Sequence, residues 1–315
     1  MEHSGKPSSR LGIGAVERET GLSKETLRIW ERRYGFPQPV RDGGDVRSYP
    51  AEQIEKLRLV KRLLDQGHRP GKILGLGIGE LQALAAAAHP VREVAAGATP
   101  GEELSPYLAC CRAHRRDELR QALMQALLRL GIERFVLDVL APLTTLIGVE
   151  WANGKLAISE EHLYTESVQT VLRPAISSLQ ASLATDDAGP RVLLTTFPQE
   201  QHGLGLLMAE AFFTLAGAHC ISLGTQTPIM EILGAAHKQQ ADIIALSFST
   251  ATHAGHALES LGALQSKVPQ GMEIWAGGGS CHALQRRLPS GIRVLDLPSL
   301  RDAVSEWRSR HAGNR

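Results

Sequence analysis

The spacing of hydrophobic positions changes once along the chain, near residue 185. Between Glu102 and Ala184, apolar residues recur three and four positions apart, as at Leu119, Leu123 and Leu127. This spacing places apolar side chains on one face of a helix, and no strand-like alternation interrupts it. The stretch therefore predicts a bundle of four helices.

After the polar break at 185–190 the chain carries five short runs rich in β-branched and aromatic residues, separated by segments long enough for helices. Strands that alternate with helices predict a parallel sheet covered on both faces, a doubly wound α/β fold of Rossmann-like or flavodoxin-like type. Ligands bind such sheets at the carboxyl ends of the strands, so the loops there are where chemistry is expected. The predicted strands are Val192–Phe197, Cys220–Leu223, Ile243–Phe248, Ile274–Ala276 and Val294–Leu297.

The first 50 residues have a different character, with short helices and turn residues. An amphipathic helix begins at Ile13, a turn follows at 20–22, and Ser23 is placed to cap a second helix over Lys24–Arg33. Leu27 and Trp30 are expected to face the core. The sequence after this helix predicts a hairpin with its tip at 42–44, so the segment has the outline of a winged helix-turn-helix.

These patterns divide the chain into four segments: a DNA-binding head at 1–75, a partly helical linker at 76–100, the bundle at 101–186 and the α/β domain at 187–315. Residues 1–75 hold 15 basic and 10 acidic residues, whereas the rest holds 19 and 23. Because the head is basic and the rest of the chain is acidic, the charge distribution favours nucleic-acid binding by the head alone. No stretch approaches the roughly 20 apolar residues of a membrane helix, so we expect a cytoplasmic protein with no membrane partner.

The head closely resembles the DNA-binding domain of the MerR family over about 65 residues. An Arg-rich helix alone is more often a solvated face, but here the order Thr-Gly-Leu-Ser at 20–23, Thr-Leu-Arg at 26–28 and Arg-Arg-Tyr-Gly at 32–35 matches the family. The resemblance implies double-stranded promoter DNA as partner, palindromic sites, and therefore a homodimer or homotetramer bound at the nucleoid. The residues expected to contact DNA are Ser23, Thr26, Arg28, Arg32, Arg33, Arg41, Arg47 and Tyr49.

His202 follows the first strand of the α/β domain, at the start of a helix. A lone loop histidine is most often structural or merely exposed. Here Glu200 is placed to accept a hydrogen bond from one ring nitrogen, and Gly203 and Gly205 leave room for a large flat ligand. These residues resemble the cobalamin-binding motif, acidic-x-His-x-x-Gly, in which the histidine is the lower cobalt ligand. That family usually has Asp where this chain has Glu200.

Later positions keep the spacing of the same family. There are 41 residues between Gly205 and Ser247 and 27 between Ser249 and Gly277. Ser249 stands where the family often has Leu. The resemblance implies that small residues line a slot for the displaced nucleotide tail of the cofactor, and the matching positions are Thr225, Thr227, Ser247, Ser249, Gly277 and Gly278.

Trp151 is followed after nine residues by Glu161 and His162, a spacing that resembles the CarH and LitR photoreceptors. In those relatives the bundle covers the upper cobalt face, with the tryptophan packed on the 5′-deoxyadenosyl group. The resemblance implies adenosylcobalamin as cofactor, with methylcobalamin as the other upper-ligand form. Some light-sensing members have a histidine directly after the tryptophan, which captures cobalt in the light, but this chain has Ala152.

Three hypotheses follow. The first is a light-sensitive transcriptional repressor that uses adenosylcobalamin as chromophore and releases DNA when the assembly breaks up. The second is a regulator that responds to cobalamin without light, which Ala152 permits. The third is a corrinoid carrier module of a methyltransferase, which the DNA-binding head argues against. No nucleophile-base or metal-hydrolase constellation stands out among the 12 histidines, so we predict a protein that is not an enzyme.

Overall fold

In a computed structural model, the chain divides into two compact units. The first contains residues 1–90 with the short segment 152–155, and the second contains 91–151 and 156–315. The structure describes residues 10–41, 47–65, 67–87, 100–183, 189–250, 252, 254–279, 281 and 285–312.

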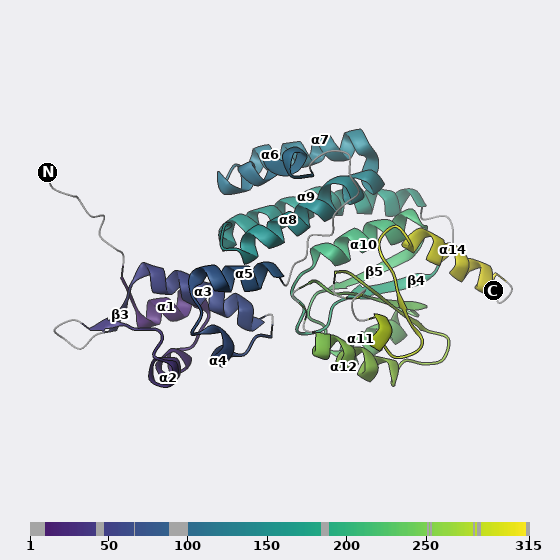
Figure 1. The fold of residues 1–315 in the computed structure, drawn as a ribbon. Coiled ribbons are helices and arrows are strands. Elements are labelled where there is room, and N and C mark those ends of the chain that lie inside the picture. The colour runs from purple at the N-terminus through teal and green to yellow at the C-terminus, as the bar shows by residue number, and fades with distance from the viewer. Residues whose placement is uncertain are drawn as a thin grey trace. The chain divides into compact units, whose positions relative to one another are not determined.

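The first unit is a small winged-helix fold (Figure 1). A three-stranded sheet has the order β1-β3-β2, and both pairs are antiparallel. The predicted hairpin is confirmed by the pairing of β2 with β3, whereas β1 was not predicted. The elements are β1 (Leu11–Gly12), α1 (Ile13–Thr20), α2 (Lys24–Tyr34), β2 (Val40–Arg41), β3 (Arg47–Tyr49), α3 (Ala51–Asp65), α4 (Pro70–Ile73) and α5 (Ile78–Ala87).

The turn between α1 and α2 has the chemistry that the sequence predicts. Gly21 ends α1 with a φ of 69°, a left-handed conformation that favours glycine. The Ser23 side chain then accepts a hydrogen bond from the Thr26 amide at 3.1 Å and caps α2. Leu27 and Trp30 are buried, as expected. The tip of the wing at 42–44 lies outside the described residues.

The segment predicted as a partly helical linker contains α5, and this helix contacts α3 of the head. Leu81 of α5 is fully buried, as are Leu57 and Leu63 of α3. A buried apolar side chain of this size stabilises a fold by about 1.5–3 kcal/mol. Residues 78–87 therefore belong to the folded first unit.

The second unit begins with the predicted four-helix bundle, formed by α6 (Pro100–Arg112), α7 (Arg116–Arg134), α8 (Ala141–Ala152) and α9 (Ile158–Leu183). A short π-helix, η1 (Phe135–Leu140), joins α7 to α8. Gly131, with a φ of 72°, interrupts the helical backbone just before it. The sequence pattern indicated neither the break nor the π-helix, because the apolar spacing continues through both.

The α/β domain confirms the doubly wound prediction. Its five parallel strands have the order β5-β4-β6-β7-β8, the flavodoxin-like order in which the sheet changes direction between β4 and β6. The elements are β4 (Arg191–Thr195), α10 (Leu204–Leu215), β5 (His219–Gly224), α11 (Ile229–Lys238), β6 (Ile243–Ser247), α12 (Ala254–Gln265), β7 (Glu273–Gly277), the 3₁₀ turn η2 (Gln285–Arg287), β8 (Ile292–Val294) and α14 (Leu300–His311).

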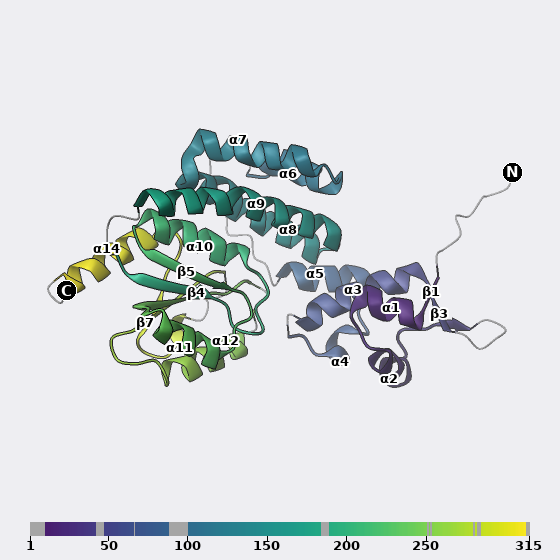
Figure 2. The same ribbon diagram turned by 180° about the vertical axis from the view of Figure 1, so that it is seen from behind.

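The two faces of the sheet have separate cores. Val192 and Leu194 of β4 pack in one core with α10, α14 and the bundle, while Leu193 points to the other core with α11 and α12. This alternation follows the two-residue period of a strand. Figures 1 and 2 show the bundle helix α9 lying over α10, so that α10 is sandwiched between bundle and sheet.

The last strand was predicted two residues too late. The sequence favours Val294–Leu297, but β8 ends at Val294. The amide of Leu295 still donates to the Ala276 carbonyl at 3.0 Å. The Asp296 carboxylate then accepts the Ser299 amide at 3.1 Å and turns the chain toward α14, so the apolar residues after 294 do not extend the strand.

One helical run of the described residues, Arg116–Ala152, is long and apolar enough to cross a membrane by length and composition alone. The core helices of a bundle meet the same test. Within this run Phe135, Val136 and Leu140 are fully buried among the bundle helices. The bundle core therefore accounts for the apolar character of the run.

We predict that Ser23→Ala weakens α2 locally. Loss of an N-cap side chain costs about 1 kcal/mol, because a helix amide loses its hydrogen-bond partner. Amide hydrogen exchange of Thr26 and Leu27 should become roughly fivefold faster, by the same estimate. Ser309→Ala on α14 serves as the matched control and should leave exchange in α2 unchanged, and equal protection of α2 in both variants would contradict the capping role.

Candidate functional site

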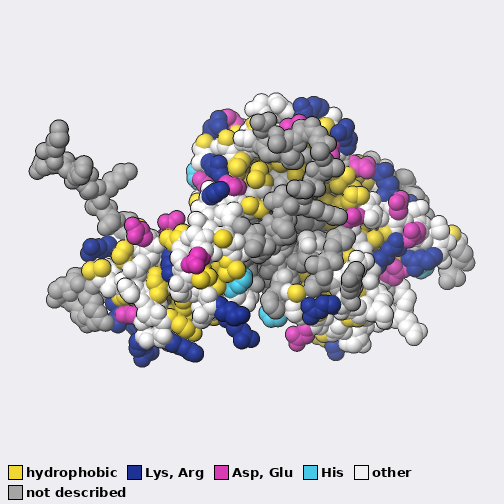
Figure 3. Space-filling view, viewed as in Figure 1, with side chains coloured by type: hydrophobic (Ala, Val, Ile, Leu, Met, Phe, Trp, Pro, Cys, Tyr) yellow, Lys and Arg dark blue, Asp and Glu magenta, His cyan; other side chains and the backbone are white. Residues whose placement is uncertain are grey.

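The first candidate site is the outer face of α2 in the head. Arg28, Arg32 and Arg33 are exposed on this helix, opposite the buried Leu27 and Trp30. Ser23 is exposed and Thr26 half-buried at its start, where their hydroxyls lie 2.9 Å apart. Figure 3 shows Lys and Arg side chains gathered along the α2 and α4 side of the first unit. A basic helix face of this kind matches the electrostatic requirement of the DNA backbone.

The wing residues are placed differently from one another. Arg47 on β3 forms an ion pair with Glu31 of α2, Nε to Oε2 at 3.2 Å, which ties the wing to the helix. Tyr49 was expected to hold a phosphate, but its side chain is fully buried beneath the wing. In this conformation it offers DNA no surface, because it fills the core. Arg41 ends β2, and its role in DNA contact stays a prediction.

The second candidate site lies at the carboxyl ends of β4 and β6, where the sheet changes direction. Glu200 follows β4 and is 2% exposed. Its Oε1 accepts hydrogen bonds from the His202 amide at 2.9 Å and from His202 Nδ1 at 2.6 Å. Its Oε2 accepts from the Ser249 amide at 2.8 Å, the Ser249 hydroxyl at 2.7 Å and the Thr252 hydroxyl. One buried carboxylate thus joins the loops after two neighbouring strands.

This arrangement shifts the pKa of both partners. Burial alone would raise the pKa of Glu200, but the hydrogen bonds from His202 and Thr252 outweigh it and lower the pKa to about 2. The hydrogen bond to Glu200 raises the pKa of His202, against the opposing effect of burial. With Nδ1 held by the carboxylate, Nε2 is the ring nitrogen left for a ligand, and 56% of the side chain is exposed.

The loop after β5 is tied to the same edge. The Thr195 hydroxyl donates to Thr227 Oγ1 at 2.8 Å, and the Gln226 amide donates to Thr196 Oγ1 at 2.9 Å. A Cβ at Gly203 would come within 3.2 Å of the methyl group of Thr225. Of the two threonines that the resemblance implied in this loop, Thr225 therefore lies beside the start of α10 and Thr227 beside the end of β4.

Close approaches explain why glycines occupy three of the predicted positions. A Cβ at Gly205 would lie 2.8 Å from Ser247 Oγ, so α10 and β6 meet there without room for a side chain. A Cβ at Gly277 would lie 2.9 Å from the Leu295 carbonyl oxygen. Gly278 has a φ of 103° and lies against the backbone of Phe248. All three glycines therefore have a structural reason in the chain itself.

The bundle carries three of the predicted residues, Trp151, Glu161 and His162. Trp151 lies in the last turn of α8 and packs, half-buried, against the shared core. Glu161 lies in the first turn of α9 and accepts the Thr165 hydroxyl at 2.7 Å. Its negative charge contributes to the raised pKa of His202, so the two side chains lie within electrostatic range. The His162 side chain is 70% exposed.

Position 152 has no side chain that could bind a metal. Ala152 follows Trp151 directly and is fully buried. A methyl group offers no metal ligand, so this position supplies nothing to a cobalt ion.

Three observations decide whether these residues fit a cobalamin. The ring of His202 is oriented by a buried carboxylate that holds Nδ1, and more than half of the side chain is exposed. Because residues 203 and 205 are glycines, no side chain projects from these two positions at the start of α10, next to His202. Among the described residues, no group of three or more His, Cys, Asp or Glu side chains could hold a free metal ion. A corrinoid brings its own equatorial ligands and needs one protein ligand, so the residues fit the group.

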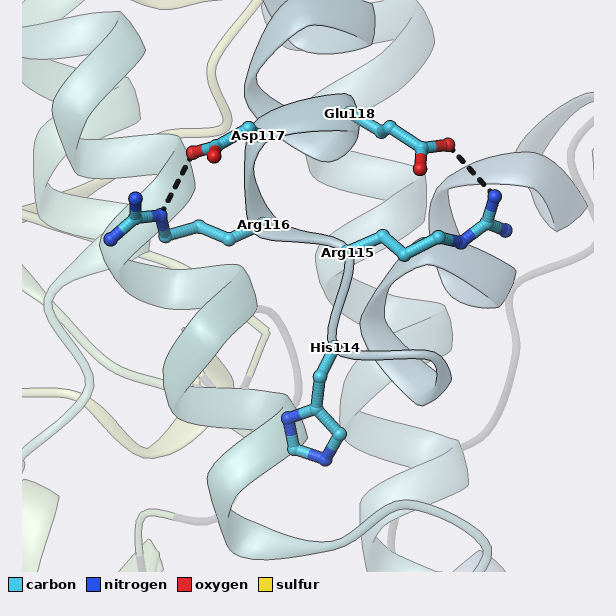
Figure 4. A pocket seen from close by; sticks show the side chains of 5 residues that line it. All are labelled: His114, Arg115, Arg116, Asp117 and Glu118. Carbon is cyan, nitrogen blue, oxygen red and sulfur yellow. Dashed lines mark hydrogen bonds and ion pairs between the residues drawn. The ribbon is translucent and has the colours of Figure 1, made fainter.

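A separate shallow hollow of about 430 Å³ lies at the turn between α6 and α7 (Figure 4). His114, Arg115, Arg116, Asp117 and Glu118 line it. Arg115 pairs with Glu118 at 2.8 Å and Arg116 with Asp117 at 3.0 Å. These exposed pairs satisfy one another, so the hollow is a solvated surface of the bundle and holds none of the predicted residues.

Sequence reasoning missed Thr252 and the threonines that end β4. Thr252 donates to Glu200, and Thr195 and Thr196 fix the loop after β5. The available signal was their position, since the loops that follow parallel strands meet at one edge of the sheet. Motif spacing alone did not point to them.

We predict that Glu200→Gln lowers the pKa of His202. The carboxylate stabilises the charged imidazolium and so raises the pKa of His202. A neutral amide removes this effect, and burial, which favours the uncharged ring, then lowers the pKa. The ring therefore stays protonated to a higher pH in the original chain than in the variant. NMR titration of the His202 ring measures the shift. Glu231→Gln, an exposed acid on α11, is the matched control, and equal ring pKa values in both variants would contradict the assignment.

Comparison with known families matches three parts of the chain. Residues 11–76 match the MerR HTH family regulatory protein model. Residues 105–173 and 190–294 match two models, each described as a B12 binding domain. The matches cover the head, the bundle and the α/β domain in that order.

Among solved structures, the monomethylamine corrinoid protein of Methanosarcina barkeri is similar with a TM-score of 0.52 and 11% identity, over 66% of this chain and all of that one. At this identity the likeness shows the fold of the second unit alone.

Two curated relatives come from Myxococcus xanthus. The HTH-type transcriptional repressor CarH is 29% identical over 269 residues, covering 84% of this chain and 87% of that protein. The HTH-type transcriptional repressor CarA is 31% identical over 239 residues, covering 76% of each. With its MerR head followed by two B12-binding regions, the chain belongs to the CarH and CarA family of MerR-type transcriptional repressors.

Proposed function

We propose that this chain is a cobalamin-dependent transcriptional repressor whose DNA binding is controlled by light through adenosylcobalamin. The observation that carries the proposal is His202, oriented by the buried Glu200 at the switch point of the sheet, on the same chain as a winged helix-turn-helix. A metal-ligand histidine with a carboxylate partner is a recurrent arrangement, because the partner fixes the tautomer and raises the basicity of the ligand nitrogen.

In this proposal His202 would hold cobalt through Nε2, and Glu200 keeps the proton on Nδ1. The residues that we assign to the nucleotide tail are Gly203, Gly205, Thr225, Thr227, Ser247, Ser249, Gly277 and Gly278. When bound, adenosylcobalamin supplies a Co–C bond that visible light breaks. The chain's own part is to orient the ring, to seat the tail and to exclude water from the upper face.

Trp151, Glu161 and His162 are the residues we assign to the upper face. An indole ring fills the volume beside an organic upper ligand and keeps water out, and Glu161 is already within electrostatic range of His202. The buried Ala152 means that no imidazole from that position can stabilise the light state. Within this proposal, His202 is therefore the residue that would hold the cobalt.

DNA binding to palindromic promoter sites needs two copies of the head, because each chain carries one. We propose a homodimer as the minimum and a homotetramer as the dark assembly on the operator. Such a regulator acts in the cytoplasm, associated with the nucleoid while it is bound to DNA. Its curated relatives are transcriptional regulators, which are not enzymes. The chain then serves as a switch between two conformations. The cofactor binds one conformation more tightly than the other, and this difference supplies the free energy that shifts the equilibrium between them.

The absorption spectrum tests the cofactor. We expect the full chain, loaded with adenosylcobalamin in the dark, to convert after a pulse of green light to an aquo- or hydroxo-like spectrum. Trp151→Phe should still bind the cofactor, because an aromatic ring of similar shape remains at 151. If the chain binds the cofactor but its spectrum does not change after the pulse, the protein senses cobalamin independently of light. If the chain binds no cofactor, the proposed role of cobalamin is wrong.

Gel shifts test the coupling of the two units. We expect promoter DNA binding in the dark to fall by roughly tenfold or more on illumination, the usual range of an allosteric coupling. His202→Ala should bind DNA equally in light and dark, since the cofactor no longer distinguishes two states. His237→Ala, an exposed histidine of α11, should behave as the original chain does. An unchanged light response in His202→Ala would refute the coupling through this residue.

A further inference from the structure

Two side chains on the outer face of α2 are chemically unlike the arginines around them. Glu25 and Ile29 are both exposed and lie four residues apart, so they share one helix face with Arg28 and Arg32. Leu27 and Trp30 point the opposite way, into the core of the head. The face that carries the basic residues therefore also carries one acid and one branched apolar side chain.

Glu25 differs from the neighbouring acids of the head in its contacts. Glu17 pairs with Lys24 at 3.3 Å, Glu19 with Arg58 at 2.6 Å, and Glu31 with Arg47. Glu25 has no hydrogen-bond or ion-pair partner among the described residues. Its place in the first turn of α2 suits the helix dipole. The dipole explains why an acid is tolerated at 25, but not why the same face carries an apolar residue one turn later.

Ile29 is 48% exposed in the middle of this helix. β-branched residues are weaker helix formers than Arg, Lys or Glu, because the helix restricts their side-chain rotamers. Leu27 and Trp30 already fill the core, so the exposed part of Ile29 contributes nothing to it. An apolar side chain at 29 therefore has no evident structural reason within the head.

Neither side chain can bind a phosphate. A carboxylate is repelled by the DNA backbone, and an isoleucine has no hydrogen-bond donor. The major groove offers partners to both, because cytosine presents an N4 amino donor and thymine presents a 5-methyl group. Four helical residues span about 6 Å, close to two base steps of about 3.4 Å. The two side chains could therefore reach bases that are near neighbours in one half-site.

We propose that Glu25 and Ile29 are the specificity-determining pair of α2, with Glu25 accepting a hydrogen bond from a cytosine amino group and Ile29 packing on a nearby thymine methyl group. The arginines of the same face supply affinity through phosphates, and this pair supplies the base preference. The inference rests on the proposed DNA-binding function and adds to it which residues distinguish one operator from another.

The test begins with selection of double-stranded DNA from a random pool by the full-length chain. The selected half-site should contain a cytosine and a thymine within about three base pairs of one another, as the length of the helix segment requires. Uracil is then substituted for each thymine in turn, which removes only the methyl group. At one position the original chain should lose about fourfold in affinity, the value of one buried methyl group.

Ile29→Ala should be insensitive to uracil at that position, whereas Ile29→Val, which keeps a branched side chain, should retain the sensitivity. Ala is the better helix former, so the substitution does not weaken α2. If Ile29→Ala remains as sensitive as the original chain at every thymine, the assignment of Ile29 is overturned.

Glu25→Gln tests the other half of the pair. An amide side chain pairs well with adenine, so repeated selection should replace the cytosine preference with adenine at that position. Glu55→Gln removes the same charge from an exposed site on α3 and should leave the selected sequence unchanged. An unchanged cytosine preference in Glu25→Gln overturns the assignment of Glu25. A chain that enriches no sequence would instead refute the DNA-binding function itself, and the base-readout assignment with it.

Discussion

The hydrogen bonds to the Glu200 carboxylate are the constraint on which the cofactor half of the molecule depends. A carboxylate that is 2% exposed is costly to bury, and five donors from two loops compensate for it. The network needs both loops in register, because Oε1 is held by the loop after β4 and Oε2 by the loop after β6. The orientation of the His202 ring is thereby fixed by the same parallel strand pairing that forms the sheet.

The bundle is coupled to this site through packing. α10 begins next to His202, and its buried residues lie in one core with those of α9 and of β4. Protein cores are packed at close to crystalline density, so a change in the volume available near Trp151 cannot be absorbed without a shift of neighbouring side chains. α10 is in contact with both layers, so direct packing links the bundle to the loop that holds His202.

The sequence was sufficient wherever a local rule decides the structure. Ser23 and Gly21 predicted the start of α2 and the turn before it, and the change from helical to strand spacing predicted both halves of the second unit. Prediction from the sequence failed where contacts between residues far apart in the chain determine the structure. The π-helix before α8 keeps the apolar spacing of an α-helix, β8 ends because Asp296 turns the chain, and the burial of Tyr49 follows from the packing beneath the wing. For the site, the motif predicted Glu200 and His202, whereas the role of Thr252 required the approach of two loops.

The two departures from the cobalamin-binding motif explain each other. Glu is one methylene longer than the usual Asp, so its carboxylate extends further from β4 toward the neighbouring loop. Where the family often has Leu, Ser249 presents both a hydroxyl and an accessible amide, which hold Oε2 at 2.7 and 2.8 Å. A leucine at 249 would remove the hydroxyl donor and place apolar volume against a buried charge, which is unfavourable without a compensating hydrogen bond. The longer acid and the smaller polar residue therefore form one matched pair, and the orientation of the His202 ring is preserved by the combination.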